Sequence, residues 1–285
     1  MKRIGNLYEK VCSIENLQLA DEKARKGKLR TYGVIEHDKK REVNLLKLRE
    51  TLLNGTFHTS KYDVFTIYEP KEREIYRLPY FPDRILHHAI MNVLEPIWVS
   101  TFTADTYSCI KNRGIHAAAK KVKQALREDP EGTTFCLKLD IRKFYPSINH
   151  DVLKSILRRK LKDKRLLCLL DEIIDSADGV PIGIYLSQYF ANLYLTYFDH
   201  WIKEQKRVKH YFRYADDIVI LASDKSYLHS LMGEIRAYLG DLKLEVKGNW
   251  QVFPVAARGI DFVGYVFFHT HTRMRKGIKK TFCRR

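Results

Sequence analysis

This chain has little of what marks membrane, secreted or zinc-dependent proteins. Its 285 residues contain no apolar run near the roughly 20 residues that span a bilayer, and its N-terminus, MKRIGNLYEK, lacks the apolar core of a signal peptide. Its five cysteines are scattered with no Cys-x-x-Cys pair, which argues against a zinc ribbon and favours reduced, mostly buried thiols. We therefore expect a cytoplasmic protein with no membrane partner.

Acidic residues are also scarce relative to basic ones. The sequence has 34 Asp and Glu against 51 Lys and Arg, a net charge of +17. Such an excess favours a polyanionic partner, either a nucleic acid or an anionic membrane surface. Because nothing in the sequence predicts a membrane segment, we favour a nucleic acid. The composition, 45% hydrophobic and 30% charged, is that of a folded protein with one large domain or two to three subdomains.

The stretch HYFRYADDIVILAS holds the pair Asp216–Asp217 between two runs rich in aromatic and β-branched residues. This pattern predicts a β-hairpin with the acids at its tip. Adjacent carboxylates repel each other and are costly to desolvate unless a positive charge lies beside them, and a divalent metal is the simplest occupant. A solvated acidic turn is the alternative for such a pair taken alone.

A second acid follows a predicted strand in TFCLKLDIRKFYPSI. Phe135, Leu137 and Leu139 alternate with less apolar residues, so the strand delivers Asp140 at its end. If the strand of Asp140 and the hairpin of Asp216 are neighbours in one sheet, the three carboxylates converge. Two metal ions about 3.5–4 Å apart, held by such carboxylates, would activate a 3′-hydroxyl and stabilise a leaving pyrophosphate. The natural chemistry is nucleotidyl transfer.

The remaining periodicities predict an α+β fold built on an antiparallel sheet. Helices are expected over most of residues 1–60, from residue 83, from residue 115, from Asn149, from Leu186 to Trp201 and around 228–239. Strand-like segments flank Glu69–Glu72 and recur in LKLEVKGNWQVFPV and IDFVGYVFF. The basic run between Lys23 and Arg30 is either a phosphate contact or a solvated helix face.

Seven blocks resemble, in order and spacing, the motifs of reverse transcriptases of the group II intron and bacterial lineage. The two catalytic blocks are LKLDIRKFYPSI and YADD. The others are EPKEREIYRLPYFPDRIL, TYSCIKNRGIHAA, GVPIGIYLSQYFANLYL, LKLEVKGNW and IDFVGYVF. The resemblance covers nearly the whole chain, and the series of blocks is far more specific than any one of them.

The resemblance implies a right-hand polymerase fold with fingers and a ferredoxin-like palm. It places the fingers at residues 1–85, the palm at 86–268 with an interleaved fingers segment at about 148–182, and a basic tail or thumb stub at 269–285. The tail RMRKGIKKTFCRR is short for a thumb, so the thumb is expected to be reduced or absent. A partner protein or RNA would then complete the grip on the nucleic acid.

The same resemblance implies an RNA-directed DNA polymerase whose catalytic residues are Asp140, Asp216 and Asp217. Asp140 and Asp216 would bind two Mg²⁺ ions, with Mn²⁺ as a substitute. The Ile141 carbonyl would be a third ligand and Asp217 a supporting carboxylate. The implied partners are template RNA, the RNA/DNA hybrid and deoxynucleoside triphosphates.

Further positions correspond to nucleotide-binding residues of the family. Lys71 and Arg73 match fingers residues that clamp the triphosphate, and Arg113 matches a basic position of the next block. Tyr145 falls at the steric gate that excludes a 2′-hydroxyl, with a core aromatic as the alternative. Lys247 would lie near the pyrophosphate as a general acid, with a surface lysine as the alternative.

The loop before the long helix indicates a subfamily. Most reverse transcriptases have Gln-Gly where this chain has Ile182–Gly183, and the intron type has Ser-Pro where this chain has Ser187–Gln188. Ile-Gly-x-x-x-Ser-Gln resembles the enzymes of diversity-generating retroelements, which copy RNA with errors at adenines and work with an accessory variability protein. Replacing an amide near the template–nucleotide pair by an apolar side chain removes a geometric check.

That resemblance implies a bacterial or phage-infected cell. Two other hypotheses remain: an antiphage-defence or other bacterial reverse transcriptase that shares the loop, and a non-catalytic RNA-binding scaffold. The three acids Asp140, Asp216 and Asp217 argue against the scaffold, because a chain without catalysis has no need of converging carboxylates.

Overall fold

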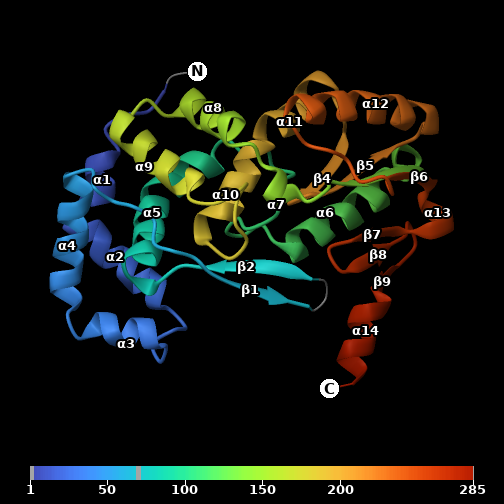
Figure 1. Cartoon of the computed structure of the whole chain (residues 1–285). Coiled ribbons are helices and arrows are strands. Elements are labelled where there is room, and N and C mark those ends of the chain that lie inside the picture. The colour runs from blue at the N-terminus through green and yellow to red at the C-terminus, as the bar shows by residue number, and fades with distance from the viewer. Residues whose placement is uncertain (1–2, 69–71, 285) are drawn as a thin grey trace. The chain divides into compact units, whose positions relative to one another are not determined.

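The computed structural model describes residues 3–68 and 72–284, and the chain falls into two units, which are described separately (Figure 1). Unit 1 consists of residues Met1–Thr101 and Ile148–Tyr194, and unit 2 of Phe102–Ser147 and Leu195–Arg285. Each unit is therefore assembled from two stretches of sequence. The predicted limits of fingers, palm and tail are functional boundaries that this division does not test, and they stay a prediction.

Unit 1 is mainly helical and has one small hairpin. Its elements are α1 (Tyr8–Cys12), α2 (Ile14–Arg25), α3 (Tyr32–Asp38), α4 (Arg41–Leu53), β1 (Asp63–Ile67), β2 (Arg73–Arg77), a helical turn (Tyr80–Arg84), α5 (Ile85–Val99), α8 (His150–Lys160), α9 (Lys164–Asp175) and α10 (Tyr185–Tyr194).

The central helix of unit 1 is α5, which contacts α1, α2 and α10. It is apolar on most sides, and Ile85, Leu86, Ala89 and Ile90 are buried, as expected for a helix surrounded by others. The amphipathic helix α8 begins at a side-chain cap, where Asn149 Oδ1 accepts the Val152 N–H (3.1 Å).

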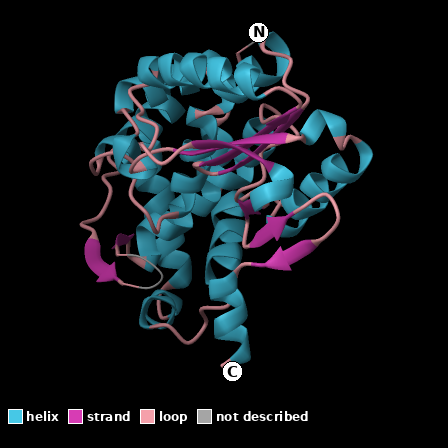
Figure 2. Ribbon diagram, turned by 90° about the vertical axis from the view of Figure 1, so that its right-hand side faces the viewer, coloured by secondary structure: helices cyan, strands magenta, loops and turns pink. Residues whose placement is uncertain are grey.

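Unit 2 contains the predicted antiparallel sheet (Figure 2). Its strands are β3 (Phe135–Asp140), β4 (His210–Tyr214), β5 (Asp217–Ala222) and β6 (Gln251–Pro254), in the order β4-β5-β3-β6. The remaining elements are α6 (Ile115–Glu128), a turn (Glu131–Thr133), α7 (Phe144–Ser147), α11 (Thr196–His200), a turn (Trp201–Gln205), α12 (Lys225–Asp241), α13 (Val255–Arg258), β7 (Ile260–Phe262), β8 (Tyr265–Phe267), β9 (Thr272–Met274) and α14 (Lys276–Cys283).

The alternation of strand residues gives the sheet two buried faces. Phe212, Val219 and Leu221 point to one face and are buried in a cluster with Ala118 and Val122 of α6. On the opposite face α12 lies along β3, β5 and β6 (Figure 1). Burial on both sides explains why β5 is an uninterrupted apolar run, and it fixes the register that sets the acids opposite one another.

The helix predicted from Leu186 to Trp201 is interrupted. α10 ends at Tyr194 and α11 begins at Thr196, because Leu195 has a ψ of 2° and leaves the helical conformation. The apolar spacing continues across this break and so conceals it in the sequence. The break coincides with the boundary between the two units.

The burial of the five cysteine thiols differs from the prediction. All five are free, but Cys168 and Cys283 are exposed and Cys109 is only half-buried, so the prediction of mostly buried thiols is wrong. Cys168 lies on the outer side of α9, whose leucines and isoleucines form the buried side. Within residues 3–68 and 72–284, no helix is both long and apolar enough to cross a membrane.

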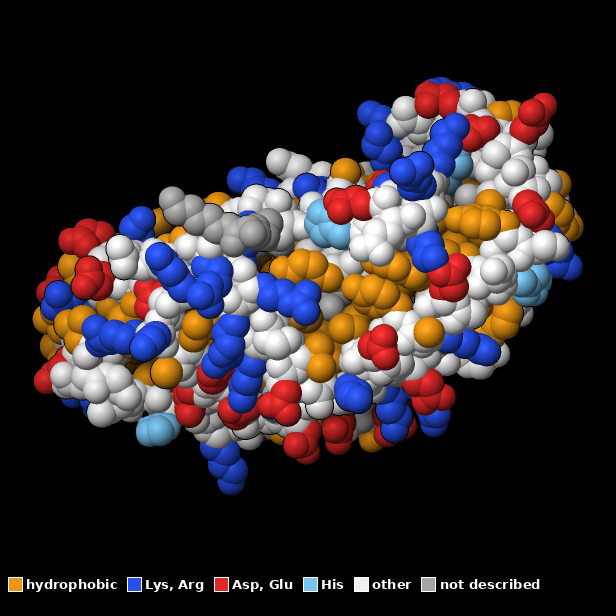
Figure 3. All heavy atoms as spheres, turned by 90° about the horizontal axis from the view of Figure 1, so that it is seen from above, with side chains coloured by type: hydrophobic (Ala, Val, Ile, Leu, Met, Phe, Trp, Pro, Cys, Tyr) orange, Lys and Arg blue, Asp and Glu red, His pale blue; other side chains and the backbone are white. Residues whose placement is uncertain are grey.

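Basic side chains are prominent on the surface. On the face drawn in Figure 3, Lys and Arg side chains are numerous and spread out, with Asp and Glu side chains between them. Neighbouring opposite charges partly screen one another, so the surface charge alone does not locate a binding site. A binding or catalytic site is marked instead by how particular residues are arranged.

Candidate active site

The hairpin of β4 and β5 carries the acidic pair at a two-residue turn. Tyr214 pairs with Asp217, so only Ala215 and Asp216 make the turn. Ala215 has a φ of 55°, a left-handed conformation that is uncommon for a residue other than glycine. The turn therefore holds Asp216 in a backbone geometry that the surrounding structure has to support.

Asp140 lies beside this turn because β3 pairs with β5. Asp140 is the register partner of Asp217, and the next residue, Ile141, donates its backbone N–H to the carbonyl of Asp216 (3.3 Å). The structure thus brings together Asp140, Asp216, Asp217 and the Ile141 backbone, as the sequence predicts.

Two lysines neutralise part of this acidic group. Lys247 donates to Asp140 twice, from Nζ to Oδ1 (2.6 Å) and from its backbone N–H to the carbonyl (2.9 Å). Lys138 forms an ion pair with Asp217, and its Nζ lies 5.3 Å from the centroid of the Phe262 ring. Lys247 was expected near the site from the sequence. Lys138 was not, although it lies two residues before Asp140 on the same face of β3.

Asp216 has the least favourable surroundings of the three acids. Burial, followed by the nearby negative charge of Asp140, raises the pKa of Asp216 to about 6. Burial also raises the pKa of Asp217, although Lys138 opposes the shift. A carboxylate pair that is destabilised by its own proximity is a favourable environment for a bound cation.

The donor set fits a hard divalent metal ion. Among residues 3–68 and 72–284, no three His, Cys, Asp or Glu side chains converge on one point, which agrees with Asp217 being directed to Lys138. Asp140 and Asp216 remain as a pair of carboxylates, and oxygen ligands of this kind suit Mg²⁺, which takes few protein ligands and retains water.

The other predicted residues of unit 2 lie at defined positions. Tyr145 lies in α7, its ring packs edge to face against Phe144 with the centroids 5.6 Å apart, and burial raises its pKa. Arg113 donates from Nη1 to the carbonyl of Thr103 (2.7 Å), so one arm of its guanidinium holds the preceding loop.

The remaining predicted residues belong to unit 1. Lys71 lies outside the described residues, and Arg73 is exposed at the start of β2. The carbonyl of Ile182 accepts the N–H of Tyr76 (2.7 Å), which ties the loop before α10 to β2. Gly183 has a φ of 119°, and an added Cβ would lie 2.5 Å from the carbonyl oxygen of Tyr76, so only glycine fits there.

Gly183 and Gln188 line a basic cavity of about 310 Å³ in unit 1. The other lining residues are Lys23, Ala24, Lys26, Lys28, Arg84, His88, Ile184 and Tyr185. Burial, followed by the charges of Arg84, Lys23 and Lys28, lowers the pKa of His88 to about 4. Four cations without a carboxylate among these lining residues create a positive potential that suits an anion. The sequence indicated only the basic run.

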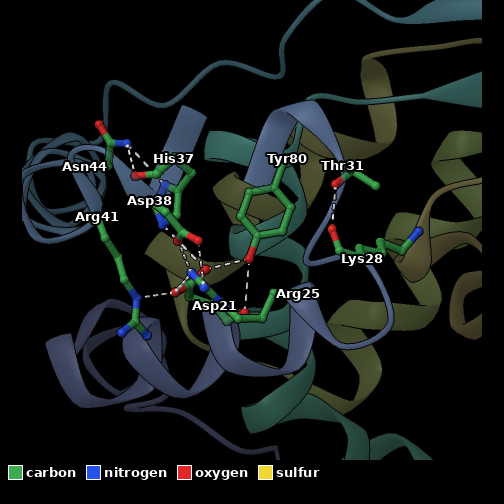
Figure 4. Close-up of polar contacts among 9 residues, drawn as sticks. All are labelled: Asp21, Arg25, Lys28, Thr31, His37, Asp38, Arg41, Asn44 and Tyr80. Atoms are coloured by element: carbon green, nitrogen blue, oxygen red, sulfur yellow. Dashed lines mark hydrogen bonds and ion pairs between the residues drawn. The ribbon is translucent and has the colours of Figure 1, made fainter. Parts of the chain in front are cut away.

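A second charged cluster in unit 1 surrounds Asp21 (Figure 4). Its side chain is fully buried and accepts from Arg25 Nη2 (2.8 Å), Arg41 Nε (2.6 Å) and the hydroxyl of Tyr80. His37 Nε2 lies 3.4 Å from Asp21 Oδ1. Burial alone would raise the pKa of Asp21, but the hydrogen bonds from these four residues lower it well below its usual range. The Asp21 carboxylate is thus already satisfied by protein groups, which indicates a structural role.

In unit 2, an antiparallel sheet holds two carboxylates at a strained hairpin turn, and a lysine lies beside them. This arrangement is that of the palm of a right-hand nucleotide polymerase. The comparison with known proteins agrees. The chain belongs to the reverse transcriptase (RNA-dependent DNA polymerase) family, which matches residues 69–267.

Two relatives show the extent of the similarity. The chain is 26% identical to Protein YkfC of Escherichia coli in an alignment that covers 81% of this chain and 73% of that protein. It is 23% identical to the group II intron-encoded protein LtrA of Lactococcus lactis in an alignment that covers 62% of this chain but only 31% of LtrA.

The fold is similar to solved telomerase structures. Apo telomerase from Candida tropicalis superposes with a TM-score of 0.55 at 12% identity, over 76% of this chain and 49% of that chain. The chain thus spans about half of that telomerase chain. The structural likeness confirms the predicted α+β polymerase fold, and the family match confirms the predicted reverse transcriptase family, whose members are RNA-directed DNA polymerases.

Proposed function

We propose that this chain copies an RNA template into DNA by adding deoxynucleotides to a 3′-hydroxyl with the help of two Mg²⁺ ions. The observation that carries the proposal is that the pairing of β3 with β5 brings Asp140 beside the turn of Asp216, where the Ile141 N–H donates to the Asp216 carbonyl (3.3 Å). Burial, followed by the charge of Asp140, raises the pKa of Asp216. In the proposed site, Asp140 and Asp216 hold the metal ions and the Ile141 carbonyl assists. When bound, the metal ions supply activation of the 3′-hydroxyl and stabilisation of the leaving pyrophosphate.

The chain's own residues would perform the remaining tasks. Lys247, whose Nζ donates to Asp140, would give a proton to the leaving group, and Lys138 pairs with Asp217. Tyr145 near Asp216 would support the sugar of the incoming nucleotide and exclude a 2′-hydroxyl. Arg73 and Arg113 would contact its triphosphate, with Lys71 as a further candidate.

Template RNA is the proposed polyanion, together with the RNA/DNA hybrid that forms during copying. The net charge of +17 and the cavity lined by Lys23, Lys28 and Arg84 support a phosphate-rich partner. A telomerase from Candida tropicalis with a similar fold was solved in complex with a fragment of telomeric RNA, which also favours an RNA partner.

Primer extension tests the activity directly. The purified chain, a DNA primer on an RNA template, dNTPs and Mg²⁺ should give DNA product that EDTA abolishes. Asp216→Asn should remove the product and leave RNA binding intact, whereas Asp241→Asn, an exposed acid of the same unit, should have no effect. Undiminished synthesis by Asp216→Asn would refute the metal assignment.

The finer proposal is an error-prone enzyme of the diversity-generating type, which acts with an accessory variability protein. Its support is the resemblance at Ile182–Gly183 and Ser187–Gln188. The Ile182 carbonyl is bonded to Tyr76, so its apolar side chain is held in a fixed loop and offers no hydrogen bond to a base.

Sequencing of the extension product tests this subtype. The wild type should misincorporate mainly opposite template adenines, and Ile182→Gln should reduce those errors. Ile182→Leu is the matched control, because it keeps an apolar side chain of similar size. Equal error rates opposite adenine in both variants would remove the argument for the subtype while leaving the polymerase proposal in place.

A further inference from the structure

A buried ion pair lies behind the hairpin turn of unit 2. Arg213 of β4 and Asp199 of α11 are both fully buried. Two guanidinium nitrogens of Arg213 donate to the two oxygens of Asp199, Nε to Oδ1 (2.7 Å) and Nη2 to Oδ2 (2.6 Å). The hydroxyls of Tyr211 and Thr106 also donate to this carboxylate. This geometry fixes the plane of the guanidinium, as bidentate pairing does in general.

The third nitrogen of the guanidinium reaches the turn itself. Arg213 Nη1 donates to the backbone carbonyl of Ala215 (3.0 Å). Ala215 has a φ of 55°, and its carbonyl belongs to the peptide bond that leads into Asp216. A left-handed alanine is unfavourable by itself, so the charged hydrogen bond stabilises a peptide orientation that the turn would otherwise leave.

The backbone of Arg213 is also held by hydrogen bonds, which restrains the contact between its side chain and the Ala215 carbonyl. Its N–H donates to the carbonyl of Asp105 (3.0 Å), and its carbonyl accepts the N–H of Tyr107 (3.0 Å). The backbone of Arg213 is thus held between the segment 105–107 on one side and β5 on the other. The carbonyl that its side chain contacts belongs to the peptide directly before Asp216.

We propose that Arg213, locked by Asp199, is a positioning residue that aims the metal ligand Asp216 through the carbonyl of Ala215. The proposal rests on the proposed function, because it takes Asp216 as a metal ligand. It predicts that the ion pair controls metal affinity and not merely the stability of unit 2. Lysine cannot replace arginine here, because an ammonium group cannot span Asp199 and Ala215 at once.

Arg213→Lys is the main variant, since it keeps the positive charge opposite Asp199 but lacks the planar guanidinium that contacts Asp199 and Ala215 together. The matched control is Tyr211→Phe, which removes another donor to Asp199 from the same buried cluster and leaves the contact between Arg213 and Ala215. Both variants should lower the melting temperature. A role in positioning, unlike a purely structural role, predicts that only Arg213→Lys changes metal binding.

Two readouts on the full chain separate these roles. Binding of Mn²⁺ alone is followed by the electron paramagnetic resonance of free Mn²⁺, and primer extension is titrated with Mg²⁺. For Arg213→Lys we expect about tenfold weaker Mn²⁺ binding and an about tenfold higher Mg²⁺ concentration for half-maximal extension. RNA binding should not change. Tyr211→Phe should keep the metal titrations of the wild type.

Equal metal titrations for the wild type and Arg213→Lys would overturn the positioning role, as would an equal change in Arg213→Lys and Tyr211→Phe. The variant Asp216→Asn separates this failure from failure of the proposed function. If Asp216→Asn binds Mn²⁺ as well as the wild type does, Asp216 is not a metal ligand and the positioning role falls with that assignment.

A second variant keeps the test informative if Arg213→Lys does not fold. Asp199→Asn preserves the size of the side chain and touches Asp216 only through Arg213. It should weaken Mn²⁺ binding in the same direction but by less, about threefold, because one oxygen still accepts from the guanidinium. An unchanged Mn²⁺ affinity in folded Asp199→Asn would contradict the proposal.

Discussion

Asp21 in unit 1 and Asp216 in unit 2 are acids in opposite electrostatic situations. Asp21 accepts hydrogen bonds from two arginines and a tyrosine, and its pKa is far below the usual range. Asp216 lies beside Asp140, and its pKa is raised to about 6. The first arrangement satisfies a buried charge, and the second leaves negative charge that a ligand has to complete. Of these two acids, the one that points to a ligand is Asp216, because its neighbours leave its charge unbalanced.

The largest effect should come from removing the charge at the incomplete site. Asp216→Asn should lower the rate of primer extension by about 1,000-fold or more, because a lost metal ligand costs several kcal/mol of transition-state stabilisation. The corresponding change at the saturated site, Asp21→Asn, should leave the extension rate of folded protein within a small factor. Single-turnover extension by both variants measures this contrast, and equal losses would break the comparison.

Stability should respond in the reverse order. Asp21→Asn leaves Arg41 without its carboxylate partner and Arg25 with Asp38 alone, around a side chain that is fully buried, so we expect unit 1 to lose about 3–5 kcal/mol of unfolding free energy. Urea unfolding measures the change. Glu36→Gln is the control, because it breaks an exposed ion pair with Lys39 and should not move the transition. A shift of the same size in both variants would show that Asp21 has no special role.

The parts of the site that local sequence patterns determine could be predicted. The alternation before Asp140 and the two runs around Asp216 identify strands, and the apolar run of β5 pairs with β3 as expected. The Asp21 cluster could not be predicted, because it joins residues 21, 41 and 80 across the fold. The sequence pattern around Asp21 indicates a charged helix exposed to solvent, so a buried position of Asp21 was not expected.

Arg213 and Asp199 were missed for a related reason. Arg213 alternates with aromatic residues in β4 and so reads as a surface position of the strand, yet it is fully buried by its pairing with Asp199. Gly183 was recognised in the sequence through the resemblance of its loop. The need for glycine depends on the approach of Tyr76, which lies more than a hundred residues earlier.

That approach gives the next prediction. Gly183→Ala should destabilise the loop of unit 1 by about 2–3 kcal/mol, because it adds a steric clash with the Tyr76 carbonyl to an unfavourable positive φ. Gly233→Ala in α12 is the matched control, since an added Cβ there meets no atom within 4 Å and alanine favours helix. Thermal unfolding should show opposite shifts for the two variants. A neutral Gly183→Ala would mean that the loop is free of β2.

The smallest effect is a difference in acid sensitivity, which sharpens the comparison of the two acids. A carboxyl with a lowered folded-state pKa stabilises the fold above its unfolded pKa of about 3.9, and this stabilisation is lost as the pH falls through the folded pKa. The stability difference between the wild type and Asp21→Asn should thus be constant from pH 7 to 5. Below about pH 4 it should shrink by at most about 1.4 kcal/mol per pH unit. Urea titrations at stepped pH measure this slope, with Glu36→Gln again as the control. If the difference stayed constant down to pH 2, Asp21 would owe its effect to packing rather than to its charge, and the distinction between a saturated and an incomplete acid would lose its electrostatic basis.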